Sequence, residues 1–237
     1  MKNILVIGTT SAIAEATARG AERFLLARNQ ERLTNRSEDL KVRGVSSIHS
    51  EIFDADDYAR HTAVIEQLVG PEQVLIAHGT LADQKVCEQD AAPALSELNT
   101  NALSVISLLT PLANDFERQG HGSIAAISSV ADNRGRQSNC IYGTAKGALS
   151  IFLQGLRNRL HKPDVQVLTI KPGFVDTPMT TAAVPKGPLW ATPEKVAGDI
   201  EKAISKNKDV LYTLGLWYLI MAIILSMSEF IFKRLSL

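Results

Sequence analysis

The chain has 237 residues, with 25 acidic and 25 basic side chains, and this length suits one domain with a sizeable core. The balanced charge excludes the basic field typical of nucleic-acid binding, so no nucleic-acid partner is expected. Its two cysteines, Cys87 and Cys140, have no further Cys or His at metal-ligand spacing, which favours a reduced, cytoplasmic protein without a metal site.

Apolar, β-branched runs alternate along the chain with stretches of helical apolar spacing. The predicted strands cover residues 3–7, 23–27, 46–53, 73–77, 123–128, 165–170 and 209–213, and the two longest predicted helices cover residues 91–118 and 138–160. The first run is too short for the core of a signal peptide. Continuously apolar strands are typical of sheets covered on both faces, and strands that alternate with helices form parallel sheets. The sequence therefore predicts a single-domain, three-layer α/β/α fold with a doubly wound, Rossmann-like sheet.

The first predicted strand ends in the turn GTTSAIA, which has the layout of a dinucleotide-binding loop with one of its three glycines. Gly8 allows the tight turn, Ala12 and Ala14 are the smallest substitutes for the other glycines, and the helix N-terminus attracts phosphate. An ordinary strand-to-helix turn is the competing interpretation. The helix that follows has room for only about six residues before Gly20, fewer than a crossover helix usually has. The residues expected to face a coenzyme here are Gly8, Thr10, Ser11, Ala12 and Ile13.

Arg28 follows the second predicted strand, where the ribose of adenosine would lie. An arginine there can hold the 2′-phosphate of NADP, whereas an acidic residue would favour NAD, so we expect NADP(H) to be preferred over NAD(H). A solvated arginine is the alternative. After the third strand, Asp54, beside Ala55, is either an acceptor for the adenine amino group or a simple helix N-cap before Tyr58.

The fourth predicted strand ends in IAHGT. Ala77 and Gly79 are expected to line the coenzyme site, because glycine lets the backbone approach a ligand closely. His78, between them, is interpreted as a packed histidine rather than a catalytic one.

The segment SSVADNRGRQSNCIYGTAK carries the predicted chemistry. Tyr142 and Lys146 are four residues apart, which places both side chains on one face of a helix. A nearby ammonium lowers the pKa of a phenol from its usual value of about 10, so Tyr142 is a candidate proton donor to a carbonyl oxygen. Ser129, at the end of a strand, can hydrogen-bond the same oxygen.

In chain order, GTTSAIA, FDADD, AHG, SSVA, YGTAK and KPGFVDTP resemble the motifs of the short-chain dehydrogenase/reductase family over residues 2–213. The resemblance implies an NADP-dependent carbonyl reductase in which Tyr142 is the general acid, Lys146 lowers its pKa and holds the nicotinamide ribose, and Ser129 orients the substrate. It also implies Asn101 as a fourth catalytic residue, with Asn99 as the alternative, and a homodimer or homotetramer formed through the two long helices. Two departures, the alanines of the first loop and IAHG in place of NNAG, bear on coenzyme geometry. The remaining coenzyme contacts implied are Pro172, Gly173, Val175 and Thr177.

The runs SSVADNRGRQSNCIYGTAKGALSIFLQGLRNRL, KPGFVDTPM and KGPLWATPEKVA resemble a narrower group, the decaprenylphosphoryl-2-keto-ribose reductases. That resemblance implies a keto-sugar substrate on a polyprenyl phosphate and a partner flavin oxidase. Arg134 and Arg136, in the loop before Tyr142, are hypothesised to contact a phosphate or sugar of the substrate. Solvation of this loop is the alternative interpretation.

Residues 214–237 form an apolar tail after a predicted NADP-binding domain of residues 1–213, and residues 210–228 contain no charged side chain. The tail is predicted to form one apolar helix from near Gly215 to Phe232, which is marginal for a membrane span of about 20 residues. Aromatic residues at its start and basic residues at its end suit a helix at a membrane surface, here the inner face of the membrane. A helix packed on the pocket, a dimer contact and a true span are the alternatives.

Two other functions compete with reduction of a keto-sugar. One keeps the mechanism and assigns a small ketone or alcohol as substrate. The other is a dinucleotide-binding scaffold or sensor without turnover, suggested by the missing glycines of the first loop and the short first helix. The intact set of catalytic residue types favours an enzyme.

Overall fold

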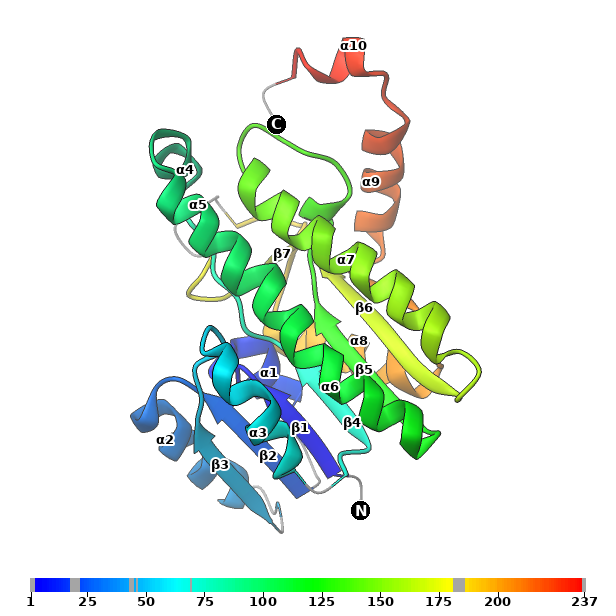
Figure 1. Ribbon diagram of the computed structural model, residues 1–237. Helices are drawn as coiled ribbons and strands as arrows, with labels where there is room; N and C mark the ends of the chain where they lie inside the picture. The colour runs from blue at the N-terminus through cyan, green and yellow to red at the C-terminus, as the bar shows by residue number, and fades with distance from the viewer. Residues whose placement is uncertain are drawn as a thin grey trace.

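A seven-stranded parallel sheet forms the centre of the computed structural model, which describes residues 3–17, 22–42, 45, 47–68, 70–180 and 186–235 (Figure 1). The strands lie in the order β3-β2-β1-β4-β5-β6-β9, and each neighbouring pair is parallel. All seven predicted strands are present, with small shifts at their ends, and the doubly wound fold is confirmed. The strands are β1 (Asn3–Ile7), β2 (Glu22–Ala27), β3 (Ile48–Ile52), β4 (Gln73–Ile76), β5 (Gly122–Ile127), β6 (Val165–Pro172) and β9 (Val210–Thr213).

Helices cover both faces of the sheet and complete the three predicted layers (Figure 1). One face carries α1 (Ala12–Thr17), α2 (Gln30–Val42) and α8 (Pro193–Ser205), and the other carries α3 (His61–Glu66), α6 (Ser104–Gln119) and α7 (Cys140–Leu160). Leu33 and Ile200 anchor the first group in the core, and Leu109 and Leu153 anchor the second; all four are at most 1% exposed. Burial of such apolar side chains drives the layers together.

The first crossover helix is short, as its sequence predicts. α1 has six residues, and Gly20 lies outside the described part of the chain. Ile13, Ala14 and Ala16 are its buried residues, and Ile13 and Ala14 join the core between the sheet and α8. The helix begins at Ala12, five residues after β1 ends at Ile7.

The strand order reverses between β1 and β4. From β1 the chain builds β2 and β3 on one side, and it then returns to build β4, β5 and β6 on the other. Open α/β sheets bind ligands outside the carboxyl ends of the strands at such a switch point. Ile7 pairs with both Leu26 and Ile76, and Ile127 pairs with Ile170, so the segments that follow these strands meet at one edge.

The long helix predicted over residues 91–118 forms with an interruption. α5 (Ala91–Leu98) is joined to α6 by a π-helical turn, η2 (Asn99–Leu103). Asn101 in this turn is fully buried, and its Nδ2 donates to the carbonyl of Glu97 at 3.1 Å. Single π-turns often mark functional sites, and this one carries a residue of the predicted catalytic set.

The prediction of one continuous tail helix is wrong. Two shorter helices form, α9 (Leu216–Ser226) and α10 (Glu229–Phe232), because Met227 and Ser228 have extended backbone, with ψ of 133° and 150°. Arg134 donates to two backbone carbonyls at this break, at 2.6 and 2.7 Å, and so satisfies acceptors left over where α9 ends. Within the described residues, no helix has the length and apolar character needed to cross a membrane.

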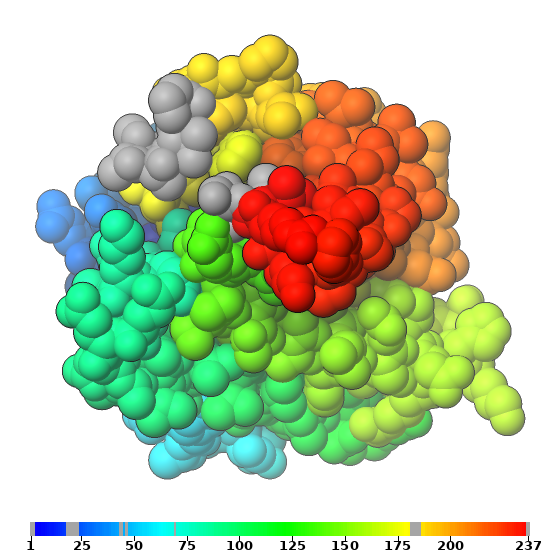
Figure 2. Space-filling view, turned by 90° about the horizontal axis from the view of Figure 1, so that it is seen from above, coloured from blue at the N-terminus to red at the C-terminus, as the bar shows by residue number. Residues whose placement is uncertain are grey.

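The tail packs beside a second, two-stranded sheet of β7 (Phe174–Val175) and β8 (Trp190–Ala191). Sequence patterning does not predict these strands, because each has only two residues. Trp217 and Met221 of α9 are buried in a small apolar cluster against Val130 and this sheet. Figure 2 shows the end of the tail as a raised cluster on the face seen from above.

Candidate active site

A pocket of about 400 Å³ lies at the carboxyl edge of the sheet, within the size range of small-molecule sites. It gathers every residue that the sequence predicts for catalysis or coenzyme binding, because these residues follow strands that end at the same edge. The predicted residues that line it are Tyr142, Lys146, Ser129, Asn101, Gly8, Thr10, Ser11, Ala12, Ile13, Arg28, Asp54, Ala55, Ala77, Gly79, Pro172, Gly173, Val175 and Thr177.

Gly8 is the residue of the first loop at which no other amino acid fits. Its φ is +84°, which glycine alone adopts readily, and a Cβ there would lie 2.4 Å from the backbone nitrogen of His78. Ala14, in contrast, is 1% exposed and packs in the core of the layer that contains α8. The helix therefore packs the methyl group of Ala14 where a dinucleotide motif has glycine, and the turn at Gly8 still forms.

Tyr142 and Lys146 lie in the first two turns of α7, and both line the pocket. The Tyr142 hydroxyl is hydrogen-bonded to the side chain of Ser129. Lys146 Nζ donates to the carbonyl of Ile127 at the end of β5, at 3.0 Å, and lies 5.7 Å from the centre of the Tyr142 ring. One hydrogen bond thus ties the lysine to the sheet while its ammonium stays near the phenol.

The prediction that the pKa of Tyr142 lies below its usual value is wrong for this arrangement. Burial raises the pKa of Tyr142 to about 12; the hydrogen bond with Ser129 opposes the rise, and the carboxylates of Glu97 and Asp132 add to it. Burial likewise lowers the pKa of Lys146 to about 8, against the pull of the same carboxylates. Desolvation dominates because it penalises the charged form of each group. Tyr142 is therefore protonated at neutral pH, and Lys146 is mostly charged.

Asn101 is held rigidly beside the lysine. Its Oδ1 accepts from the backbone nitrogen of Thr80, and its Nδ2 donates to Thr80 and to the Glu97 carbonyl. A Cβ at Gly79 would lie 2.5 Å from Asn101 Oδ1 and 3.5 Å from Lys146 Nζ, so the glycine permits this close approach. The alternative, Asn99, accepts a hydrogen bond from Tyr58 and does not line the pocket.

Two arginines line the pocket after β2. Arg28 was predicted, and Arg32, in the first turn of α2, was missed although it lies four residues further along. Asp54 lines the pocket as well, and its Oδ1 accepts from the backbone nitrogen of Asp56. Asp54 is not the helix N-cap that was its alternative interpretation, because Asp57 occupies the N-cap of the short helix η1 (Tyr58–Arg60).

His78 lines the pocket as a neutral side chain. Burial lowers its pKa to about 3, and the nearby charge of Lys146 adds to the effect. Its Nε2 is 2.8 Å from Ser104 Oγ. This agrees with the interpretation of a packed histidine, since an imidazole with this pKa is not protonated to the imidazolium at neutral pH and so cannot act as its acid form.

The tail packs behind the pocket wall, as one of the alternatives for residues 214–237 predicts. Trp217 is 5% exposed, and its Nε1 donates to the carbonyl of Leu189 at 3.3 Å. A Cβ at Gly173 would lie 2.0 Å from the same nitrogen. Gly173 lines the pocket, so α9 touches the back of the pocket wall directly.

Arg134 faces the tail and does not line the pocket, and its contact with substrate stays untested. Besides the two carbonyls at the tail break, Arg134 pairs with Glu229 at 2.8 Å, and its guanidinium lies 3.7 Å from the ring centre of Phe232. Its donors therefore face the tail. Arg136 donates to the Val130 carbonyl at 3.4 Å and does not line the pocket; its contact with substrate stays a hypothesis.

A sequence model of short chain dehydrogenases matches residues 2–187. The chain belongs to this family. It is therefore an oxidoreductase. A protein of Mycobacterium tuberculosis, strain H37Rv, described as an uncharacterized oxidoreductase, is 38% identical over 217 residues, which cover 88% of this chain and 87% of that protein.

Solved structures support the same fold. A short chain dehydrogenase of Burkholderia cenocepacia in complex with NADP has a TM-score of 0.85 at 18% identity, and the alignment covers 100% of both chains. An NAD⁺-bound xylitol dehydrogenase has a TM-score of 0.78 at 18% identity, over 89% of this chain and 96% of that one. Since one of these neighbours holds NADP and the other holds NAD⁺, similarity of fold does not indicate which of the two coenzymes this chain binds.

Proposed function

We propose that this enzyme reduces a ketone with NADPH. The observation that carries the proposal is the meeting of Tyr142, Ser129 and Lys146 in one pocket with the Gly8 turn. A ketone oxygen placed at the hydrogen bond between Tyr142 and Ser129 would meet a proton donor and a second hydroxyl together. Membership of the short chain dehydrogenase family supports the reaction class.

The chemistry of the lining suits a dinucleotide. Gly8 lines the pocket and has no room for a Cβ, which would meet the His78 backbone. The hydroxyls of Thr10 and Ser11 lie beside the start of α1, where phosphate oxygens find N–H donors. Arg28 and Arg32 are suited to a 2′-phosphate, which favours NADP(H) over NAD(H). When bound, the nicotinamide coenzyme supplies a hydride.

Tyr142 supplies the proton. The carbonyl carbon gains the hydride, and the carbonyl oxygen takes the phenolic proton, leaving an alcohol and a tyrosinate. A phenol with a pKa of about 12 keeps its proton at neutral pH, yet it is far more acidic than a protonated alkoxide, whose acidity is close to that of water at about 15.7. Ser129 donates to the developing oxyanion, and charged Lys146 stabilises the tyrosinate.

The proposed substrate class is supported by the surface of the tail. α9 and α10 expose a row of apolar side chains, among them Leu219, Ile223 and Phe230, each 57–63% exposed. Lys233 and Arg234 follow them in the sequence. A helix pair of this composition suits an anionic membrane surface. It supports a keto-sugar carried on a polyprenyl phosphate as the substrate, reduced at the inner face of the membrane.

The proposal is tested by following NADPH oxidation with keto-sugars and with small ketones, in the wild type and in Tyr142→Phe. We expect the variant to lose at least about 10²-fold in kcat, since general acid catalysis contributes 10²–10⁴-fold, and to bind NADPH normally by calorimetry. Tighter binding of NADH than of NADPH would contradict the roles of Arg28 and Arg32. Equal activity on small ketones would favour a generic reductase. A fully active Tyr142→Phe would remove Tyr142 as the proton donor, and a wild type that binds NADPH without oxidising it would leave a scaffold without turnover.

A further inference from the structure

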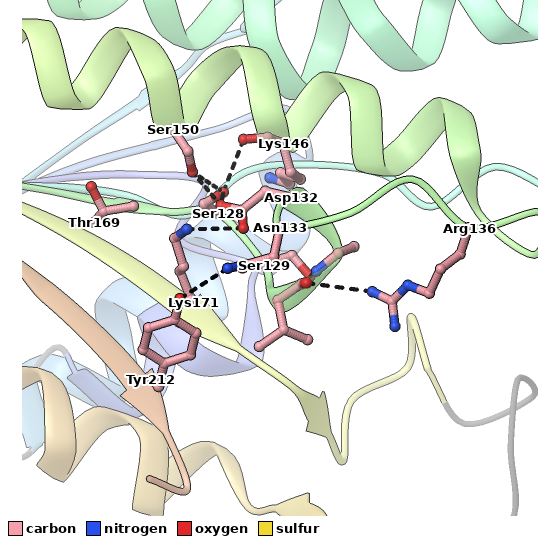
Figure 3. Close-up of polar contacts among 12 residues, drawn as sticks. Ser128, Ser129, Asp132, Asn133, Arg136, Lys146, Ser150, Thr169, Lys171 and Tyr212 are labelled. Atoms are coloured by element: carbon pink, nitrogen blue, oxygen red, sulfur yellow. Dashed lines mark hydrogen bonds and ion pairs between the residues drawn. The ribbon is translucent and has the colours of Figure 1, made fainter. Parts of the chain in front are cut away.

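A buried ion pair lies directly behind the catalytic residues. Asp132, at the end of the short helix η3 (Val130–Asp132), has a side chain that is 1% exposed. Its Oδ1 is 2.9 Å from Nζ of Lys171, whose side chain is 11% exposed (Figure 3). The ring of Tyr212 lies on another side of the ammonium, 5.7 Å from ring centre to Nζ. Neither charge belongs to the pocket lining, and the proposed mechanism uses neither.

Two serines connect this carboxylate to the catalytic helix (Figure 3). Ser150 Oγ donates to Asp132 Oδ2, and Ser128 Oγ lies 3.0 Å from the same oxygen. Ser128 Oγ is also 3.1 Å from the backbone carbonyl of Lys146. The two serine hydroxyls are also 2.8 Å apart. Each hydroxyl has one proton, and the acceptors within reach of Ser128 are Asp132 Oδ2 and the Lys146 carbonyl.

The network thereby joins three segments that carry the site. Ser128 precedes Ser129, which is the N-cap of η3 and accepts from the backbone of Ala131. Ser150 lies one helical turn beyond Lys146 on α7. Lys171 directly precedes the turn at Pro172 and Gly173 that borders the pocket.

We propose that the ion pair of Asp132 and Lys171 is a positioning unit for catalysis, which fixes Ser129, Lys146 and the turn after β6 relative to one another. This rests on the proposed function, because those three elements are the ones that the reduction uses. A displacement of about 1 Å in such a constellation is enough to cost about 10²-fold in rate.

Asp132 also acts on Lys146 through its charge. The ionisable groups that face Lys146 are Glu97 from α5, Asp132 from η3, Tyr142 from its own helix, and neutral His78 after β4. Glu97 and Asp132 both favour the ammonium. Loss of one carboxylate therefore moves the titration of Lys146 to lower pH.

The test compares Asp132→Asn with the double variant Asp132→Asn/Lys171→Met, in which no buried cation is left without its carboxylate. We measure kcat, KM, NADPH affinity, the pH profile and the thermal unfolding midpoint. We expect kcat to fall by about 10²-fold in both variants, while NADPH affinity stays within about twofold of the wild type. We also expect the basic limb of the plot of kcat against pH to move below pH 8. The double variant should recover the unfolding midpoint and not kcat. Asp115→Asn, which breaks an exposed pair with Arg118, is the control and should match the wild type.

Recovery of both stability and kcat in the double variant would overturn the proposal, since the pair would then serve the fold alone. So would an Asp132→Asn enzyme with normal kcat and an unmoved basic limb. Failure of the proposed function is seen separately, in an inactive wild type or an active Tyr142→Phe, and removes this inference with it. If Asp132→Asn does not fold, the folded double variant decides through its kcat and pH profile.

Discussion

Gly8 serves both the backbone turn after β1 and the proposed coenzyme site. Its positive φ and the nearness of the His78 backbone mean that any side chain meets both a conformational penalty and a clash. Gly8→Ala is therefore expected to destabilise the fold by at least about 1–3 kcal/mol and to abolish NADPH binding, as measured by thermal unfolding and calorimetry.

The matched control for Gly8 is Gly198→Ala in α8. A Cβ at Gly198 meets open space, and alanine is the better helix residue by about 0.5–1 kcal/mol. The same chemical change should therefore raise the unfolding midpoint and leave coenzyme affinity unaltered. Equal effects at the two positions would show that the turn imposes no special demand.

Lys146 gives the reaction a basic limit. Its pKa of about 8 lies well below the usual value of 10.5, so the ammonium that stabilises tyrosinate is present below pH 8 and is lost as the pH rises through that value. We expect kcat to fall over this range, while Tyr142, with a pKa of about 12, remains protonated. Lys146→Arg keeps its charge at all these pH values. This variant should react more slowly than the wild type, and its kcat should not fall as the pH rises above 8. A wild-type profile that is flat up to pH 10 would contradict this assignment.

At the scale of elements, α9 and α10 combine a buried face with an exposed apolar face. Leu219→Ser/Ile223→Ser/Phe230→Ser should reduce co-sedimentation with vesicles of phosphatidylcholine and phosphatidylglycerol by at least about tenfold. Full burial of one such apolar side chain contributes about 1.5–3 kcal/mol, and each serine removes this contribution to membrane binding. Turnover of a small ketone in solution should be unchanged.

Val42→Ser/Val86→Ser serves as the control for the tail. These residues are 88% and 49% exposed on α2 and α4 (Gln84–Gln89), so their replacement removes exposed apolar surface away from the tail. Equal vesicle binding by the wild type and the triple tail variant would eliminate the membrane-surface proposal and favour a tail that only supports the pocket.

At the scale of the whole molecule, the helix layer of α5, α6 and α7 leaves apolar side chains uncovered. Leu95, Leu103 and Ile151 are 64%, 55% and 71% exposed, which is typical of surfaces that pair with a second copy. We propose that the chain forms a homo-oligomer through this surface, and we expect Ile151→Asp to yield monomers in sedimentation experiments. Val86→Asp should leave the assembly intact, and an oligomer that survives Ile151→Asp would place the contact elsewhere.

The sequence predicts the strands and the pocket lining well for one physical reason. Continuous apolar runs identify buried parallel strands, and the residues that follow such strands converge wherever the order of the sheet reverses. The residue types after each run then indicate the chemistry without any knowledge of distances.

What the sequence missed depends on contacts between distant segments. The pairing of Asp132 with Lys171, the packing of Trp217 on Gly173 and the use of Arg134 by the tail each need the folded chain before their partners are known. The pKa of Tyr142 was predicted in the wrong direction for the same reason, because spacing along a helix reveals the neighbouring charge and not the loss of water.

The two tryptophans of the chain both pack against Phe174. Trp190 stacks on its ring at 5.4 Å between centroids, and Trp217 meets it edge-on at the same separation. All of the intrinsic indole emission therefore originates at one spot behind Gly173. The protein carries a built-in optical reporter, whose signal should quench through energy transfer as reduced nicotinamide fills the cavity, with no label attached.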